Sequence, residues 1–441
     1  MESVLQISLS EWQTLGPEQD TRLFKRSLQD DACRQLAEQL TKSKRLDITE
    51  LAQGLRIAAT SYVGRVQVGD LVLTVRPKLL GMPLLRLLRY AYGLRQVALY
   101  DTSEQATSSL GFQELLALQL MAEVEELLAR GLHRDYLRRN EDLEKPRGRI
   151  DFLRLVRAGE SARATLPCVH YPRVEDTHLN RLVLAGVAFA ATLLGDPELR
   201  GKAHRLQKQM AKTVKILPLS RMSLVMAGRE MDRRTRAYEP ATTLIEILLN
   251  MEDVSLDEGT DPVAVKGFLF DMNRFFQALL SRFLHDNLVG IQLLDERSVR
   301  QMFSYEPDKN PQHRRAPKLR PDFTVMAGRQ VLAVLDAKYR DLWELSLPRE
   351  MLYQLALYAL AREEKCREAV ILYPTLKDGA KEQVVGIERF SASFQLKPRV
   401  TMRPVNLLQL DRLVSGSAQD IELAKQRRSW AALLAFGSAN S

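Results

Sequence analysis

This 441-residue sequence has few cysteines and no apolar run long enough to span a membrane. Its three cysteines, Cys33, Cys168 and Cys366, lie far apart and form no CxxC pair, which argues against a disulfide framework and a zinc site. The longest apolar run, residues 182–194, is shorter than the ~20 residues that a membrane-spanning helix needs. The amino terminus shows no basic and apolar signal-peptide pattern. We therefore expect a cytoplasmic protein that binds no membrane.

Basic residues are concentrated in one stretch of an otherwise globular composition. Residues 200–236 hold 11 of the 64 lysines and arginines but only two of the 55 acidic residues, so this stretch alone accounts for the formal net charge of +9. Within it, a predicted helix over residues 197–214 places basic side chains on one face and apolar side chains on the other. This cationic face is either an ordinary solvated surface or a binding surface for DNA or an acidic partner. Its candidate DNA-binding residues are Lys208 and Lys212.

The hydrophobic patterns predict an α+β protein of several domains. Apolar residues alternate on both sides of Gly69-Asp70 and predict a β-hairpin, and Thr177 is expected to cap a later helix. Helices are predicted over residues 84–92, 112–130, 178–194, 268–284 and 350–361, and strands over 291–294, 322–326, 331–337 and 370–373.

We expect these elements to form four parts. They are a mixed α/β amino-terminal domain (1–158), a helical, basic middle region (159–261), a carboxy-terminal α/β domain (262–400) and a carboxy-terminal extension (401–441).

Two aspartates and a lysine are expected to converge in the segment 321–340. Asp322 begins one predicted strand, whereas Asp336 and Lys338 lie two residues apart at the end of the next and share one face of it. In a hairpin the start of the first strand lies opposite the end of the second, so all three charges meet. Asp336 directly follows an apolar run, which is a costly place for a charge that has no use.

This trio is suited to the hydrolysis of phosphodiester bonds. Two carboxylates, here Asp322 and Asp336, can hold a divalent cation such as Mg²⁺, which polarises a phosphate and lowers the pKa of a bound water. Lys338 can orient that water or stabilise developing negative charge. The alternative interpretation of the same residues is a set of surface salt bridges.

Pro321-Asp322, Asp336 and Lys338 resemble the signature of the PD-(D/E)xK nucleases, and Gln354 and Tyr358 resemble the QxxxY helix of their RecB-like branch. Five further segments resemble, in this order, the McrC family, the nuclease subunit of modification-dependent McrBC restriction systems. They are residues 62–78, 84–94, 147–152, 168–182 and 270–280. The resemblance implies that residues 262–400 form a restriction-endonuclease-like PD-(D/E)xK domain.

One position departs from the family pattern. The family usually has glutamate where this sequence has Gln277, which can offer a metal only a neutral oxygen. Either Gln277 has a minor supporting role, or Asp271 or Glu306 compensates for the missing carboxylate.

The resemblance also implies partners. McrC cleaves DNA together with McrB, a GTP-hydrolysing AAA+ hexamer that moves DNA and recognises modified cytosine, and it docks on that ring through its amino-terminal part. Residues 1–158 are therefore the expected docking part. No GxxxxGK[ST] motif occurs in this sequence, so we expect the chain to bind no nucleotide itself. Because a double-strand cut needs two such sites, the nuclease domains are expected to dimerise during cleavage.

Two other functions remain open on the sequence alone. One is a stand-alone RecB-like nuclease that needs no motor, and the other is a non-catalytic adaptor that stimulates an AAA+ ring. The basic residues just before Asp322 either contact phosphates of the cleaved strand or form an ordinary charged loop. They are Arg314, Arg315, Lys318 and Arg320.

Overall fold

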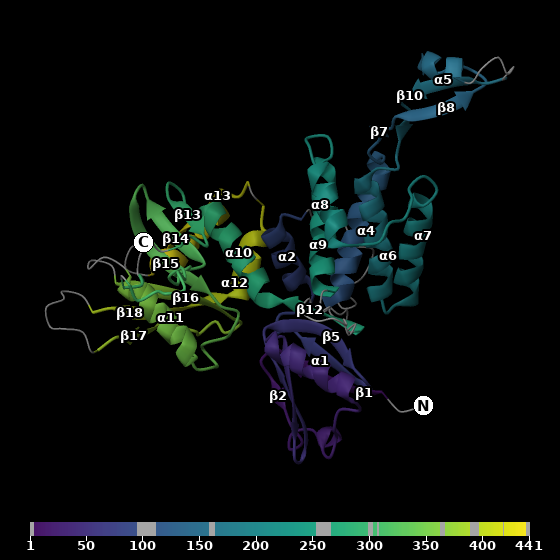
Figure 1. The fold of residues 1–441 in the computed structure, drawn as a ribbon. Helices are drawn as coiled ribbons and strands as arrows, with labels where there is room; N and C mark the ends of the chain where they lie inside the picture. The colour runs from purple at the N-terminus through teal and green to yellow at the C-terminus, as the bar shows by residue number, and fades with distance from the viewer. Residues whose placement is uncertain are drawn as a thin grey trace. The chain divides into compact units, whose positions relative to one another are not determined.

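The computed structural model (Figure 1) describes residues 4–94, 112–157, 164–252, 266–298, 303–306, 308–361, 367–388, 397–417 and 419–437. The chain divides into two compact units. The first combines Met1–Gln96 with Val254–Ser441, and the second is built mainly from Gly111–Asp253. Cys33 and Cys168 are buried free thiols, whereas Cys366 lies outside the described residues. No described helix has the length and apolar character that a membrane span requires.

The amino-terminal part of the first unit contains β1 (Leu5–Ser10), β2 (Thr14–Leu15), η1 (Thr21–Leu23), α1 (Asp31–Lys42), β3 (Leu46–Leu51), β4 (Gly54–Ala59), β5 (Tyr62–Val68), β6 (Leu71–Arg76) and α2 (Gly81–Tyr92). A later strand, β12 (Lys266–Asp271), joins them in a four-stranded sheet of order β1-β6-β5-β12. A three-stranded sheet has the order β2-β4-β3. The predicted hairpin is confirmed as the antiparallel β5–β6 pair, which turns at Gly69 with φ of 60°.

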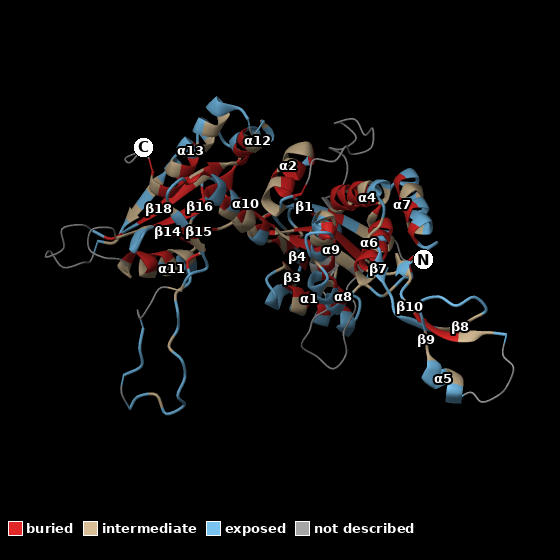
Figure 2. Ribbon diagram, turned by 90° about the horizontal axis from the view of Figure 1, so that it is seen from above, coloured by how far each residue is buried: buried red, intermediate tan, exposed pale blue. Residues whose placement is uncertain are grey.

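The carboxy-terminal part of the first unit is a sheet with helices on both faces. Its elements are α10 (Met272–Asn287), β13 (Gln292–Asp295), β14 (Phe323–Ala327), β15 (Gln330–Ala337), α11 (Arg349–Leu360), β16 (Glu368–Thr375), β17 (Gln383–Gly386), β18 (Arg399–Asn406), α12 (Leu407–Ser415) and α13 (Ile421–Phe436). The six-stranded sheet has the order β13-β14-β15-β16-β18-β17, with β15, β16 and β18 parallel. Figure 2 shows α11 on one side of this sheet and α12 and α13 on the other.

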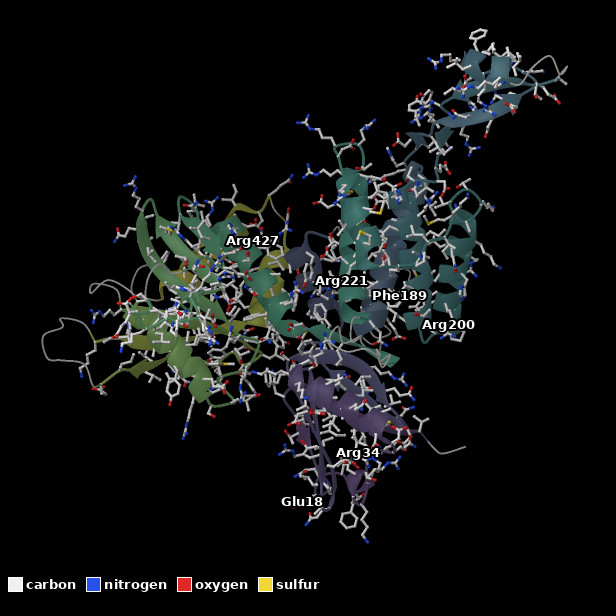
Figure 3. All side chains as sticks on the ribbon, viewed as in Figure 1. Glu18, Arg34, Phe189, Arg200, Arg221 and Arg427 are labelled. Atoms are coloured by element: carbon white, nitrogen blue, oxygen red, sulfur yellow. The ribbon has the colours of Figure 1, made fainter. Side chains whose placement is uncertain are left out.

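Backbone and side-chain bonds fix these helices in place. Arg427 of α13, labelled in Figure 3, donates to the carbonyl oxygens of Leu413 and Gly416 at the end of α12. Under α11, the apolar core includes Leu355, Tyr358, Ile371, Tyr373 and Val400. Both faces of the central strands are therefore covered.

The second unit is a group of helices with small sheets attached. Its elements are α4 (Phe112–Arg130), β7 (Asp135–Tyr136), β8 (Arg139–Leu143), β9 (Arg149–Ile150), α5 (Phe152–Arg157), β10 (Leu166–His170), β11 (Arg173–Val174), α6 (His178–Leu193), α7 (Pro197–Met210), α8 (Arg221–Arg229), η2 (Arg236–Tyr238) and α9 (Glu239–Glu252). Thr177 caps α6 as predicted, because its hydroxyl accepts a bond from the backbone N–H of Asn180.

The cationic helix is confirmed as α7, although it ends at Met210 rather than at Val214. Its apolar face is buried, including Ala203, Leu206 and Met210. Lys208 on the opposite face and Lys212 in the following turn are exposed.

The unit boundaries differ from the four parts expected from the sequence. Helix α4, expected in a domain of residues 1–158, packs against α6 and α9 in the second unit. The cause is its nearly all-round apolar surface, which only neighbouring helices can cover. Strand β18, expected to begin an extension at residue 401, lies between β16 and β17 with Val400, Thr401 and Met402 buried. The carboxy-terminal α/β domain therefore continues past residue 400.

The helix predicted over residues 268–284 also differs, because its first turn is a strand. Residues Lys266–Asp271 form β12, which pairs antiparallel with β5, and the helix begins only at Met272. Asp271 ends the strand and caps the helix, since its side chain accepts bonds from the backbone N–H groups of Asn273 and Arg274. Helical periodicity alone missed this change of conformation.

We predict that Gly267→Ala weakens the pairing of β12 with β5. Gly267 has a φ of 155°, and an added Cβ would lie 2.5 Å from both the carbonyl oxygen of Arg65 and the Cα of Val66. The expected loss is about 1–3 kcal/mol in the free energy of unfolding, measured by chemical denaturation of the full chain. The matched control is Gly228→Ala in α8, where an added Cβ meets no atom within 4 Å. A Gly267→Ala variant as stable as the parent would contradict this account of β12.

Candidate active site

The ends of β14 and β15 bring together the three residues predicted to be catalytic. Phe323 pairs with Leu335, so Asp322, just before β14, lies opposite Asp336. The Nζ atom of Lys338 lies 2.9 Å from Oδ2 of Asp336 and 3.6 Å from Oδ2 of Asp322. The hairpin geometry expected from the sequence is therefore present.

Burial sets the electrostatics of this trio. Asp336 is only 2% exposed, and burial together with the charge of Asp322 raises its pKa to about 6, against the opposing effect of Lys338. Burial acts to lower the pKa of Lys338, but the two neighbouring carboxylates outweigh it and the pKa is raised. Lys338 is therefore a cation at neutral pH, which suits it to stabilise negative charge rather than to accept a proton.

The carboxylate oxygens are unequally satisfied. Oδ2 of Asp322 accepts a 2.7 Å bond from the backbone N–H of Ala337. Oδ1 of Asp336 is buried and accepts no hydrogen bond from any described residue. A buried oxygen without a donor is costly, and a cation would remove that cost.

These oxygens fit Mg²⁺ better than a metal held entirely by protein ligands. Among the described residues, no group of three or more His, Cys, Asp or Glu side chains is arranged to hold a metal ion. Mg²⁺ keeps several waters and is commonly bound through one or two carboxylates. Asp322 and Asp336 match that donor set.

The Gln354–Tyr358 pair of α11 lies beside the segment that leads to Asp322. The side-chain amide of Gln354 donates to the Tyr358 hydroxyl over 2.7 Å, and this hydroxyl donates to the carbonyl oxygen of Arg320 over 2.9 Å. Arg320 is two residues before Asp322, so the pair fixes the backbone that leads into β14. The pair thus contacts the segment that leads to Asp322, and its supporting role stays a prediction.

Gln277 also reaches the site, in an unexpected environment. Its side-chain Nε2 lies 3.3 Å from Oδ1 of Asp322 and 3.5 Å from Oε1 of Glu296. The backbone N–H of Glu296 donates to the carbonyl oxygen of Asp322 over 2.9 Å, and Glu296 adopts a left-handed φ of 49°. Gln277 is therefore an amide placed between two carboxylates.

Sequence reasoning missed Glu296 and chose other residues to compensate for Gln277. Asp271 is engaged as the cap of α10 and accepts a bond from the Tyr62 hydroxyl. Glu306 makes no side-chain contact with the trio among the described residues. The signal for Glu296 was its position directly after β13, the strand that pairs with β14.

The basic candidates lie in two separate places. The residues of the segment before β14 belong to the first unit and are exposed: Arg314, Arg315, Lys318 and Arg320. Asn310 closes a turn there by bonding both the N–H and the carbonyl of Arg314. Lys208 and Lys212 belong to the second unit, so the basic candidates do not form one cluster in the sequence or within one unit.

Comparison with known protein families shows which family this chain belongs to. Residues 57–374, more than half of the chain, match the family described as the McrBC 5-methylcytosine restriction system component. The chain belongs to this family. The family predicted from the sequence is thereby confirmed. A search of curated proteins finds no match for this McrBC component.

Two solved structures match this chain. One is a chain in the refined half-complex from a tetradecameric assembly of Thermococcus gammatolerans McrB AAA+ hexamers with bound McrC. It is 20% identical, the match covers 96% of this chain and 99% of that one, and the TM-score is 0.62. Another, from the cryo-EM structure of the Thermococcus gammatolerans McrBC complex, is 20% identical over 64% of this chain and 88% of that one, with a TM-score of 0.47. The first likeness shows a shared fold over nearly the whole chain.

We predict that Gln277→Glu destabilises the metal-free McrBC component at pH 8. The new carboxylate would face Asp322 at 3.3 Å and Glu296 at 3.5 Å, where the parent has an amide. Repulsion between these partly exposed charges is expected to cost ~1–3 kcal/mol in the free energy of unfolding.

Thermal unfolding with and without Mg²⁺ measures this effect. The added carboxylate should make Mg²⁺ raise the Tm of the variant more than that of the parent. The matched control is Gln35→Glu on the exposed surface of α1. If Gln277→Glu and Gln35→Glu show the same stability at pH 8, the placement of Gln277 between two acids is wrong.

Proposed function

We propose that this McrBC-family chain is the DNA endonuclease subunit of a restriction system and hydrolyses phosphodiester bonds with Mg²⁺. The observation that carries the proposal is the convergence of Asp322, Asp336 and Lys338, with a buried oxygen of Asp336 that no described residue supplies with a donor. We assign the carboxy-terminal α/β domain to the PD-(D/E)xK nucleases on the same residues.

In this proposal Asp322 and Asp336 would hold the cation. When bound, Mg²⁺ supplies positive charge that polarises the scissile phosphate and lowers the pKa of an attacking water. The backbone N–H of Ala337 and the amide of Gln277 orient the Asp322 carboxylate. The apolar strand β15 keeps bulk water away from Asp336, which strengthens every charge interaction there.

In this proposal Lys338 stabilises negative charge on the phosphate of the substrate. Its pKa is raised by the two carboxylates, so it stays protonated at neutral pH. Its ammonium can donate a hydrogen bond to a phosphate oxygen as negative charge develops there. Gln354 and Tyr358 do not touch the reacting atoms but hold the backbone at Arg320.

We extend the proposal to a partner, a McrB-like GTP-hydrolysing AAA+ hexamer. The supporting facts are the family membership and the similar fold of a chain from an assembly of McrB AAA+ hexamers with bound McrC. Under this proposal the partner hydrolyses GTP and recognises modified cytosine, and this chain binds no nucleotide. Two nuclease domains come together when both strands are cut.

One experiment separates this function from its alternatives. The purified chain is mixed with Mg²⁺ and with methylated or unmethylated DNA, with and without the AAA+ partner and GTP. Cleavage only with the partner and GTP supports the proposal. Cleavage by the chain alone supports a stand-alone RecB-like nuclease, and stimulated GTP hydrolysis without any cleavage supports a non-catalytic adaptor.

We predict that Asp336→Ala and Lys338→Ala abolish cleavage while leaving stimulation of the partner's GTP hydrolysis intact. Each removes a charge that the transition state needs, so the single-turnover rate is expected to fall at least ~100-fold. The matched control is Asp31→Ala, whose side chain is 91% exposed on α1. A parent-like cleavage rate in Asp336→Ala would disprove the site.

We predict that Lys208→Glu combined with Lys212→Glu weakens DNA binding most at low salt. Each lysine that contacts a phosphate releases a counterion. Losing two lysines should therefore reduce the slope of the logarithm of the DNA association constant against the logarithm of the salt concentration by about 2. The binding assay is fluorescence anisotropy at several salt concentrations. The control, Lys42→Glu with Lys397→Glu, changes the net charge equally on exposed lysines elsewhere. Loss of partner assembly with unchanged DNA binding would assign the cationic face to protein.

A further inference from the structure

The backbone immediately after Lys338 is held by residues from the start of the chain. Tyr339 follows the catalytic lysine and is 3% exposed. Its carbonyl oxygen accepts a 2.9 Å bond from the indole Nε1 of Trp12, and its hydroxyl donates to Oε1 of Glu11 over 3.1 Å. Glu11 and Trp12 directly follow β1, more than 300 positions earlier in the sequence.

The remaining backbone group of Tyr339 is also engaged. Its N–H donates to Oδ1 of Asn273 over 2.9 Å, and the amide of Asn273 donates to the Ser61 hydroxyl over 2.6 Å. The ring of Phe276 packs edge-to-face on the Tyr339 ring with centroids 5.9 Å apart. Tyr339 is therefore fixed by its N–H, its carbonyl, its hydroxyl and its ring.

Glu11 and Trp12, which follow β1, are both in energetically unfavourable states. Trp12 has a φ of 62°, a left-handed conformation that a bulky side chain rarely adopts. Glu11 is 2% exposed, and its Oε2 has no partner among the described residues. Burial raises the pKa of Glu11 to about 7, although a bond from the Lys78 N–H and the Tyr339 hydroxyl oppose that rise. In these states each residue makes one hydrogen bond to Tyr339: Glu11 accepts from its hydroxyl, and Trp12 donates to its carbonyl oxygen.

We propose that Glu11 and Trp12 are positioning residues for the catalytic lysine. They hold Tyr339 so that the ammonium of Lys338 stays between Asp336 and Asp322. The proposal rests on the nuclease function proposed above and extends it, because it gives the amino-terminal part of the first unit a role in cleavage besides docking. Because Tyr339 directly follows Lys338, a displacement of Glu11 or Trp12 at the end of β1 would shift the backbone next to Lys338.

Four substitutions test the two bonds separately. Trp12→Phe removes the indole N–H that bonds the Tyr339 carbonyl but keeps an aromatic ring beneath Arg340, whose guanidinium lies 5.1 Å from the Trp12 ring. Glu11→Ala removes the acceptor of the Tyr339 hydroxyl. Glu11→Gln is the conservative control, because its side-chain oxygen can still accept that bond and the bond from Lys78 N–H over 2.6 Å. Tyr339→Phe removes the hydroxyl and replaces Glu11→Ala if the latter fails to fold.

Two measurements are made on each folded full-length variant. The first is the single-turnover cleavage rate with the partner and GTP at several Mg²⁺ concentrations. The second needs no cleavage: it is the rate at which acetic anhydride acetylates Lys338 in metal-free protein, measured by mass spectrometry against exposed Lys208 as internal reference.

The expected result is a fall of ~10- to 100-fold in the cleavage rate of Trp12→Phe and Glu11→Ala, since a misplacement of about 1 Å has effects of this size. The Mg²⁺ concentration for half-maximal rate should not change, because both carboxylates remain. Acetylation of Lys338 should be faster than in the parent, and Glu11→Gln should match the parent in both measurements.

The proposal is overturned if Trp12→Phe and Glu11→Ala leave both rates unchanged, or if Glu11→Gln is as impaired as Glu11→Ala. If the parent itself does not cleave DNA with the partner, the proposed function fails. In that case the acetylation of Lys338 alone decides whether Glu11 and Trp12 position it.

Discussion

The ammonium of Lys338, placed between Asp336 and Asp322, is the interaction on which the rest of the site depends. Taking a carboxylate out of water is expensive, and Asp336 is almost completely buried at the end of an apolar strand. The ion pair reduces this cost but does not remove it, since the pKa of Asp336 is still raised. Such a pair contributes little to stability, and removing one partner leaves an uncompensated buried charge. The surrounding structure has to hold both partners in place.

Helix α10 contributes to that support from one face. Asn273 and Gln277 are four residues apart, so they lie on the same side of the helix. Asn273 accepts the N–H of Tyr339, just after Lys338, while Gln277 contacts Asp322, just before β14. The cap formed by Asp271 sets where this helix starts, and the same residue ends β12. The pairing of β12 with β5 therefore connects the amino-terminal sheet to the position of both contacts.

The sequence predicted the parts of the site that are close together along the chain. Asp322, Asp336 and Lys338 lie within one hairpin, and the alternation of a strand is enough to place them on a common face. Gln354 and Tyr358 were predictable for the same reason, because one helical turn relates them. Glu296 was not, since only the pairing of β13 with β14 brings it to Asp322. Nothing local in residues 266–271 shows that they pair with a hairpin two hundred positions earlier.

Asp322 and Asp336 differ in how fully their carboxylate oxygens are hydrogen-bonded, and the amide of Gln277 contributes to this difference. A glutamate there could not donate a hydrogen bond to Asp322 and would repel it, whereas the amide of Gln277 points a donor at Oδ1. The backbone N–H of Ala337 occupies the other oxygen, so the protein itself satisfies both oxygens of Asp322. Among the described residues, Asp336 has only Lys338 on one oxygen, and its second oxygen is buried without a donor. The strongest demand for positive charge at the site therefore comes from Asp336, the residue that the fold has buried most deeply.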